Sequence, residues 1–423
     1  MFGISFSLGQ VSVKEFEIIE LPNGIRVIFK QVTYSKIVHC GYVLEAGTRD
    51  EIDGEEGIAH FWEHMSFKGT KQRKAFQVLN SLEVLGGELN AYTTKEKMWF
   101  HASLPEKHTE KAFDVLTDIV FRSVFPQKEL EIEKGVVLEE ISMYLDTPEE
   151  YIQDEFEHLF FKGSSLGNYI LGTPKTVKSF TTKKIQKFVK ETIDTKHVVF
   201  SIVGNLSIER VHYLVDKYIR QIPKLTSGRK RVSAIKKQNI FTIEQEQNNN
   251  QAHCILGWKA YSQRDEKRLP LFMLSNWLAG PGLTAKLNVV LREKKGYVYS
   301  IESNYQPFVD AGMINFYFGT DKKYLHKSID LIHKELQAVK NKSLGAVQLK
   351  QLKEQVLGQL MMAEESLSNL MQMMGKSLLD YNAVESFEEV NDKIQKIKAT
   401  DLQTIAQEIF IEEKQSRLIL LPS

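Results

Sequence analysis

The chain contains short apolar runs and longer segments in which apolar residues recur with the period of a helix. Runs with the composition of strands occur at 24–29, 37–44 and 197–204. Helical patterns occur at about 57–68, 106–121 and 127–144. The strands come in groups and do not alternate strictly with helices. Each half of the chain is therefore predicted to be α+β, an antiparallel-rich β-sheet with helices packed on one face.

The chain resembles itself at about half of its length. His39-Cys40 recurs 214 residues later as His253-Cys254, and Phe100 is echoed 216 residues later by Phe316. Offsets that drift this slowly predict a duplicated domain. We expect an N-terminal domain at 1–222, a linker at 223–240 and a C-terminal domain at 241–423.

The predicted linker begins with a basic run, Pro223-Lys224-Leu225-Thr226-Ser227-Gly228-Arg229-Lys230-Arg231. Such a run could bind nucleic acid or an acidic partner. However, no aromatic residues are interleaved with it, and the rest of the chain is close to neutral. These features favour a solvated linker between the domains.

Composition narrows the class of protein. The 423 residues are 42% hydrophobic and 26% charged, as in globular proteins. With 55 Lys and Arg against 54 Asp and Glu, no overall field would attract nucleic acid or an anionic membrane. The segment MFGISFSLGQVSVKEFEI lacks the basic start of a signal peptide, and two cysteines are too few for a disulfide scaffold. We expect a soluble, cytoplasmic protein that does not span a membrane.

The clearest chemical motif is His60-Phe61-Trp62-Glu63-His64. On a helix, His60 and His64 project from one face at a spacing that can bind one metal ion, and Glu63 lies close to that face. The order is the inverse of the HExxH zinc motif. Zinc bound by two imidazoles and a carboxylate would keep one position for water, and Glu63 could accept the proton of that water.

A third ligand is expected from the helix at 127–144. Glu133 and Glu140 are seven residues apart and lie on one side of it. One could bind the metal while the other orients a ligand. Spacing alone does not choose Glu140 over Glu139. The apolar stripe predicted to be buried on this helix consists of Val136, Val137, Ile141 and Leu145.

Taken together, these motifs resemble the pitrilysin-type zinc peptidases, whose short-chain branch includes the mitochondrial processing peptidase β subunit and bacterial relatives. The similarity includes HFWEH, the second Glu of Val137-Leu138-Glu139-Glu140-Ile141, and the segments Leu21-Pro22-Asn23-Gly24, Phe67-Lys68-Gly69-Thr70, Gly86 to Thr93, Leu171-Gly172-Thr173 and Leu291 to Gly296.

The resemblance implies a role for each matching residue. The zinc ligands would be His60, His64 and Glu140. The base would be Glu63, and Glu133 would support a ligand. The strand edge that pairs with a peptide would include Asn90 and Ala91, although Asn90 could instead close a turn. The residues that bind substrate and stabilise the oxyanion would be Arg292 and Tyr299. Without the resemblance, these two would be a charged helix end and an ordinary strand residue.

The implied protein is a bacterial zinc endopeptidase with one Zn²⁺ per chain, which cleaves short or unfolded peptides in an enclosed chamber. The resemblance also implies that one chain is half of a clamshell, so that a homodimer would share its sites between subunits. Two alternatives remain: a non-catalytic structural subunit of the same fold, and a peptide-binding module, which would not need Glu63.

Overall fold

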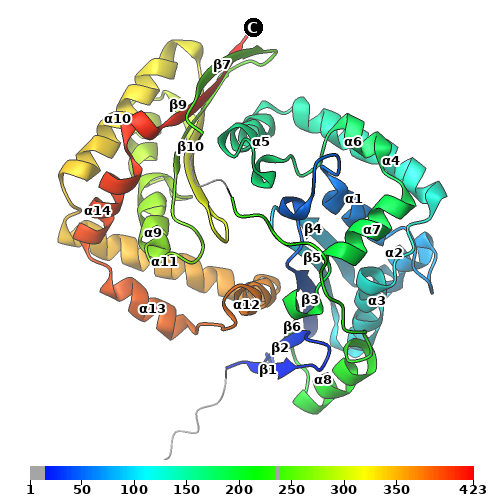
Figure 1. Ribbon diagram of the computed structural model, residues 1–423. Coiled ribbons are helices and arrows are strands. Elements are labelled where there is room, and N and C mark those ends of the chain that lie inside the picture. The colour runs from blue at the N-terminus through cyan, green and yellow to red at the C-terminus, as the bar shows by residue number, and fades with distance from the viewer. Residues whose placement is uncertain (1–14, 235–238) are drawn as a thin grey trace, which may run out of the picture.

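The computed structural model describes residues 15–234 and 239–423. These residues form two sheets with their helices, arranged as two lobes (Figure 1). Most of the N-terminal segment considered above as a signal peptide lies outside the described residues. Among the described helices, none combines the length and the apolar character that crossing a bilayer requires.

The first sheet has the strand order β1-β2-β6-β3-β5-β4. Its strands are β1 (Glu17–Glu20), β2 (Arg26–Gln31), β3 (Ile37–Leu44), β4 (Glu88–Thr93), β5 (Met98–Pro105) and β6 (Val198–Gly204). Only β2 and β6 pair in parallel; the other neighbours are antiparallel. Strand β4 lies at an edge, where one side of its backbone has no neighbouring strand of the sheet.

The second sheet has the order β7-β11-β8-β10-β9. Its strands are β7 (Thr242–Gln247), β8 (Ala252–Lys259), β9 (Val298–Pro307), β10 (Gly312–Thr320) and β11 (Ser416–Pro422). Here β7 and β11 form the parallel pair. The order and directions match those of β2-β6-β3-β5-β4 strand for strand. This match confirms the predicted duplication, and β9 corresponds to the edge strand β4.

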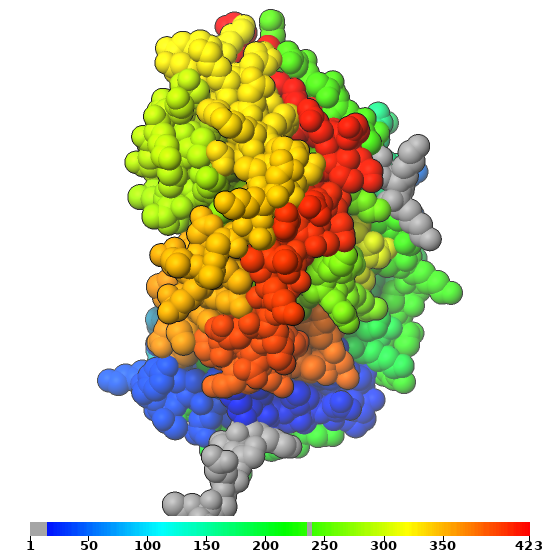
Figure 2. Space-filling model, turned by 90° about the vertical axis from the view of Figure 1, so that its left-hand side faces the viewer, coloured from blue at the N-terminus to red at the C-terminus, as the bar shows by residue number. Residues whose placement is uncertain are grey.

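Most helices of each half cover one face of their own sheet, as predicted. The first half contains α1 (Ile58–Ser66), α2 (Ala75–Glu83), α3 (Thr109–Phe121), α4 (Gln127–Leu145), α5 (Pro148–Phe160), α6 (Pro174–Ser179), α7 (Thr182–Thr192) and α8 (Ile208–Leu214). The second contains α9 (Arg268–Ala279), α10 (Leu325–Asn341), α11 (Ala346–Glu365), α12 (Leu367–Tyr381), α13 (Phe387–Lys396) and α14 (Ala399–Ile409). Helices α10, α13 and α14 form the outer face of the second half (Figure 2).

Two helices cross between the halves and cover the remaining sheet faces. Met371, Met374 and Leu378 of α12 pack on the first sheet. Gly375 allows the close approach, because a Cβ there would lie 2.8 Å from the Trp99 ring. In return, α5 packs its buried phenylalanines on β8 and β11 of the second sheet (Figure 1). The predicted α+β class is confirmed, and this exchange supplies a layer that was not predicted.

The predicted linker is solvated only in part along its basic run, in which Pro223, Lys224, Thr226, Gly228 and Lys230 are exposed. The Arg229 side chain is 12% exposed and pairs with Glu55 (2.6 Å) and Glu191 (3.0 Å). The Arg231 side chain is 15% exposed and pairs with Asp50 (2.8 Å) and Glu45 (3.0 Å). Carboxylates of the first half therefore hold this segment against that half, because both guanidinium groups need partners when water is removed. The prediction of a solvated run was therefore wrong for Arg229 and Arg231, although other residues of the run are exposed.

Candidate metal centre

The N-terminus of helix α1, which carries the HFWEH motif, is fixed by specific contacts. Its N-cap, Gly57, has φ +89°. The two oxygens of the Glu51 carboxylate accept hydrogen bonds from the backbone N–H groups of Gly57 and Ala59, each at 3.0 Å. This carboxylate satisfies donors at the helix N-terminus that no helical carbonyl can reach. The start of α1 is thereby fixed relative to the segment before it.

The Leu171-Gly172-Thr173 segment supports the same helix end. Gly172 has φ +74°, and a Cβ there would lie 2.2 Å from the carbonyl oxygen of Glu56. No other residue could occupy this position without moving the backbone. The hydroxyl of Thr176 also donates to the Glu56 carbonyl, at 2.7 Å. The segment thus holds the entry to α1 in place.

The structure brings His60, His64 and Glu140 together. Their possible ligand atoms lie within 4.8 Å of one another. The Nε2 atoms of His60 and His64 are 3.8 and 3.7 Å from the carboxylate oxygens of Glu140. The imidazoles come from α1 and the carboxylate from α4, so the packing of these two helices assembles the group.

This group fits zinc. With bonds of about 2.0–2.1 Å and tetrahedral angles, the ligand atoms of a zinc ion lie about 3.3–3.4 Å apart. The two separations to Glu140 are within about 0.5 Å of that value. Burial, followed by the proximity of His64, lowers the pKa of His60 to about 3, and the neutral imidazole is the form that binds a metal.

Glu133 orients His64. Its Oε1 lies 2.8 Å from Nδ1 of His64, which leaves Nε2 of His64 for a metal. Its Oε2 lies 2.6 Å from Nζ of Lys68. Burial favours the neutral acid, but the bonds from His64 and Lys68 outweigh it and lower the pKa of Glu133. The buried carboxylate therefore stays charged beside the histidine.

Three of the glutamates of α4 have different surroundings. Glu133 is buried and Glu140 is half-buried beside the histidines, whereas Glu139 is exposed. The buried side of the helix consists of Leu130, Glu133, Val137 and Ile141. The predicted buried stripe was correct for Val137 and Ile141. It was wrong for Val136 and Leu145, which are exposed.

Glu63 is held by a strand and not by its own helix. The hydroxyl of Thr93, at the end of β4, donates to Oε2 of Glu63 at 2.5 Å. Burial raises the pKa of Glu63, and the nearby Glu140 adds to this, while Thr93 and His64 oppose it. A carboxylate with a raised pKa is a stronger base than an exposed one.

Asn90 and Ala91 lie within β4, at the edge of the first sheet. Asn90 is exposed and pairs with His101 in the middle of the strand. The alternative in which Asn90 closes a turn is therefore wrong. The free side of β4 presents backbone groups to which an extended chain could add as a further strand.

The structure also brings Arg292 and Tyr299 together, but on the second half. Arg292 lies in a short π-helix (Asn288–Glu293), and its guanidinium is 5.4 Å from the ring centroid of Tyr299. Tyr299 lies on the edge strand β9 and is 83% exposed. Between the described residues, no hydrogen bond or ion pair joins these two to His60, Glu63, His64 or Glu140.

A cavity of about 580 Å³ separates α5 from the β9 edge. Its lining includes Tyr299 and the carboxylates of Glu149, Glu150, Asp154 and Glu302, and it contains no Lys or Arg. Burial raises the pKa of Asp154 to about 6. The positive charge of Lys95 lowers this pKa, whereas the negative charges of Glu157 and Glu150 raise it. The cavity is therefore suited to a cationic side chain.

No role was predicted from the sequence for Thr93 or Lys68. Lys68 lies four residues after His64, which is one helical turn along the same side. Thr93 lies two residues after Ala91, so both face the same side of the strand. These spacings can be read from the sequence, but the packing of β4 against α1 cannot.

Comparison with family models gives two adjoining matches. The model described as "Insulinase (Peptidase family M16)" matches residues 26–174, and "Peptidase M16 inactive domain" matches residues 179–356. The first match contains the His60, His64 and Glu140 group. The second contains Arg292 and Tyr299.

Relatives are similar over almost the whole chain. An "Uncharacterized zinc protease" of Bacillus subtilis, YmxG, is 30% identical over 402 residues, which cover 94% of this chain and 96% of that protein. An "Uncharacterized zinc protease" of Rickettsia bellii is 30% identical over 409 residues, covering 96% and 98%. Among solved structures, a protease from Helicobacter pylori has a TM-score of 0.87 at 20% identity, covering 96% and 99%.

Proposed function

Because the chain belongs to peptidase family M16, we propose that it is a zinc-dependent endopeptidase with one catalytic centre per chain. The observation that carries this proposal is the convergence of His60, His64 and Glu140 beside a carboxylate, Glu63, that another element holds in place. A metal site with three protein ligands and a nearby base is the arrangement that metal-assisted hydrolysis of a peptide bond uses.

Each residue of the centre has a distinct task in this proposal. His60, His64 and Glu140 hold the zinc ion, which when bound polarises the peptide carbonyl and makes water more acidic. Glu133 keeps the proton of His64 on Nδ1, so that Nε2 faces the metal. Glu63 takes the proton of the attacking water, and Thr93 fixes the direction in which its carboxylate points.

The edge of β4 is proposed to hold the substrate. An extended peptide would pair with the backbone of Asn90 and Ala91, which favours short or unfolded chains over folded ones. The acidic cavity beside Tyr299 would bind a Lys or Arg side chain of the same peptide. Together these features support cleavage of unfolded peptides near basic residues, and the enclosed chamber stays a prediction.

Tyr299 and Arg292 are proposed to donate hydrogen bonds to the oxyanion that forms at the carbonyl carbon. In a homodimer with shared sites, they would serve the zinc centre of the partner subunit. Tyr299 also lines a cavity together with α5 of the first half of its own chain, so action within one chain is the alternative arrangement. Mixing of Glu63→Gln subunits with Tyr299→Phe subunits distinguishes these arrangements.

Measurement of bound zinc together with cleavage of a fluorescence-quenched peptide library tests the proposal. We expect one zinc per chain and cleavage that depends on Glu63. A non-catalytic subunit or a peptide-binding module would bind peptides without cleaving them, and that outcome would refute the endopeptidase. The similarity to the processing peptidase β subunit and the cytoplasmic location both stay predictions.

A further inference from the structure

The turn between β4 and β5, residues 94–97, buries three consecutive charged side chains. We call it the interdomain turn. Lys95, Glu96 and Lys97 are 8%, 5% and 6% exposed. Charged groups are rarely buried this far unless each has a partner, because removing an ion from water costs several kcal/mol. Turns between strands are usually solvated, so specific contacts must account for this burial.

The two lysines of the interdomain turn contact different helices. Nζ of Lys95 is 3.1 Å from Oε1 of Glu157 on α5 and donates to the carbonyl of Asn168 at 2.5 Å. Nζ of Lys97 is 2.8 Å from Oδ1 of Asp380 on α12. These helices are the two that cross between the halves.

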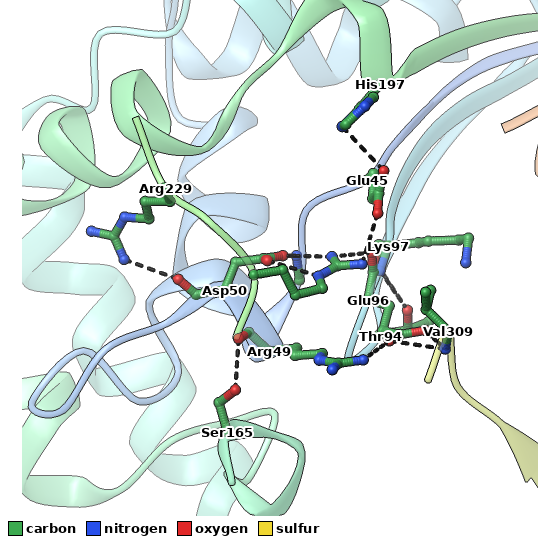
Figure 3. Close-up of polar contacts among 12 residues, drawn as sticks. Glu45, Arg49, Asp50, Thr94, Glu96, Lys97, Ser165, His197, Arg229 and Val309 are labelled. Carbon is green, nitrogen blue, oxygen red and sulfur yellow. Dashed lines mark hydrogen bonds and ion pairs between the residues drawn. The ribbon is translucent and has the colours of Figure 1, made fainter. Parts of the chain in front are cut away.

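The central residue of the turn contacts the second half directly. Glu96 pairs with Arg49 and accepts a hydrogen bond from the backbone N–H of Val309 at 3.1 Å (Figure 3). Arg49 also pairs with Asp310 at 2.6 Å. Val309 and Asp310 form the loop between β9 and β10. The interdomain turn therefore contacts both helices that cross between the halves and the β9–β10 loop of the second half. Its position depends on how the second half packs against the first.

The same turn ends the strand on which the catalytic centre depends. Thr93, the partner of Glu63, is two residues from Lys95. Strand β4 pairs only with β5 in the sheet, so its far edge is not held by another strand. The adjacent Tyr92 donates to Gln372 of α12 at 2.9 Å. A shift of α12 or of the β9–β10 loop would consequently move β4 and the Thr93 hydroxyl.

We propose that the interdomain turn is a positioning device: docking of the second half on Lys95, Glu96 and Lys97 sets the placement of β4 and, through Thr93, the direction of the Glu63 carboxylate. Packing of the two halves against each other would then control the orientation of the Glu63 carboxylate, the proposed base. This inference rests on the proposed peptidase function only for its catalytic consequence.

The test uses the full-length chain and Lys97→Met. Asp380 keeps a second partner in this variant, Lys376 at 2.7 Å, so no carboxylate is left unpaired. The control for loss of a lysine ion pair at the surface is Lys217→Met, which breaks a pair with Glu110 inside the first half and leaves Glu110 paired with Arg210 at 2.6 Å. Lys97→Arg preserves the charge and should restore the wild-type behaviour.

Hydrogen–deuterium exchange of the β4 amides is the first measurement, and it requires no activity. We expect exchange in residues 88–93 to become about tenfold faster in Lys97→Met and to stay unchanged in Lys217→Met. Equal exchange in the two variants would overturn the proposal. If the wild type cleaves no peptide, the peptidase function fails, but this comparison still decides whether the turn controls β4.

Kinetics per zinc-loaded site provide the second measurement. We expect Lys97→Met and Thr93→Val each to lower kcat about tenfold, and the double variant to be no slower than the slower single variant, because both act through one contact. A merely structural role would reduce the folded fraction without changing kcat per site. An unchanged kcat, or a double variant about 100-fold slower, would overturn the link to Glu63.

Discussion

Zinc affinity should fall in a graded way when three glutamates of α4 are changed one at a time to Gln. Glu140→Gln replaces a direct ligand, Glu133→Gln replaces the partner of a ligand, and Glu139→Gln changes an exposed side chain on the same helix. The substitutions are chemically identical, and the outer two positions are seven residues apart. Any difference in zinc binding must therefore come from position in the structure.

The expected magnitudes follow from these contacts. Removing the partner of a ligating histidine weakens metal binding by about 10–100-fold, or about 1.4–2.7 kcal/mol. Glu133→Gln should fall near the lower end, because an amide oxygen can still accept from Nδ1 of His64, which is 2.8 Å away. Glu140→Gln should exceed about 100-fold, since it removes the only anionic ligand of the group. Glu139→Gln should have no effect.

Competition with a chromophoric zinc chelator gives the dissociation constants. The melting temperature of each metal-free variant shows that the fold is retained, and the rise in melting temperature on adding zinc should rank the variants in the same order. Equal zinc binding by Glu139→Gln and Glu140→Gln would refute the assignment of the third ligand. Wild-type affinity in Glu133→Gln would refute its role in orienting His64.

Further predictions concern the base, the second half and the cavity. Glu63→Gln should retain zinc while kcat falls by about 10²–10⁴-fold, and turnover near the wild-type rate would show that Glu63 is not the base. If sites are shared in a homodimer, equal mixing of Glu63→Gln with Tyr299→Phe should restore about a quarter of the wild-type activity once subunit exchange is verified; no gain over the average of the two variants would place both groups in one chain. Asp154→Asn should reduce the preference for Lys-containing peptides over neutral analogues. In the wild type this preference should rise as the pH passes about 6, because the raised pKa keeps Asp154 neutral below that pH, and a flat profile would exclude Asp154 from recognition.

The residues of α1 could be predicted because helical geometry alone places His60, Glu63 and His64 close to one face. The choice between Glu139 and Glu140 could not be made in this way. Neighbouring residues of a helix differ by about 100° in direction, so the choice depends on how α4 packs against α1. The family resemblance pointed to Glu140, and the structure places its carboxylate oxygens 3.8 and 3.7 Å from Nε2 of His60 and His64.

Contacts between distant parts of the chain account for what the sequence did not reveal. Arg229 and Arg231 lie in a segment with the composition of a solvated linker, but their partners come from residues 45–55 and from Glu191. The exchange of α5 and α12 was likewise hidden. An apolar helix face shows that the helix packs against a surface, but it does not show which sheet supplies that surface.

The exchange of α12 has a consequence for synthesis on the ribosome. The last strand of the first sheet ends at Gly204, and α12 does not begin until Leu367, about 160 residues later. Synthesis proceeds at roughly 5–20 residues per second, so α12 is made about 8–30 s after the first sheet is complete. Until then, the apolar sheet face that includes Val43, Trp99 and Val199 is not covered by α12. During that interval, the α12 of a neighbouring nascent chain fits the face as well as its own does. Chain order thus exposes this duplicated protein to domain swapping before its second half has been made.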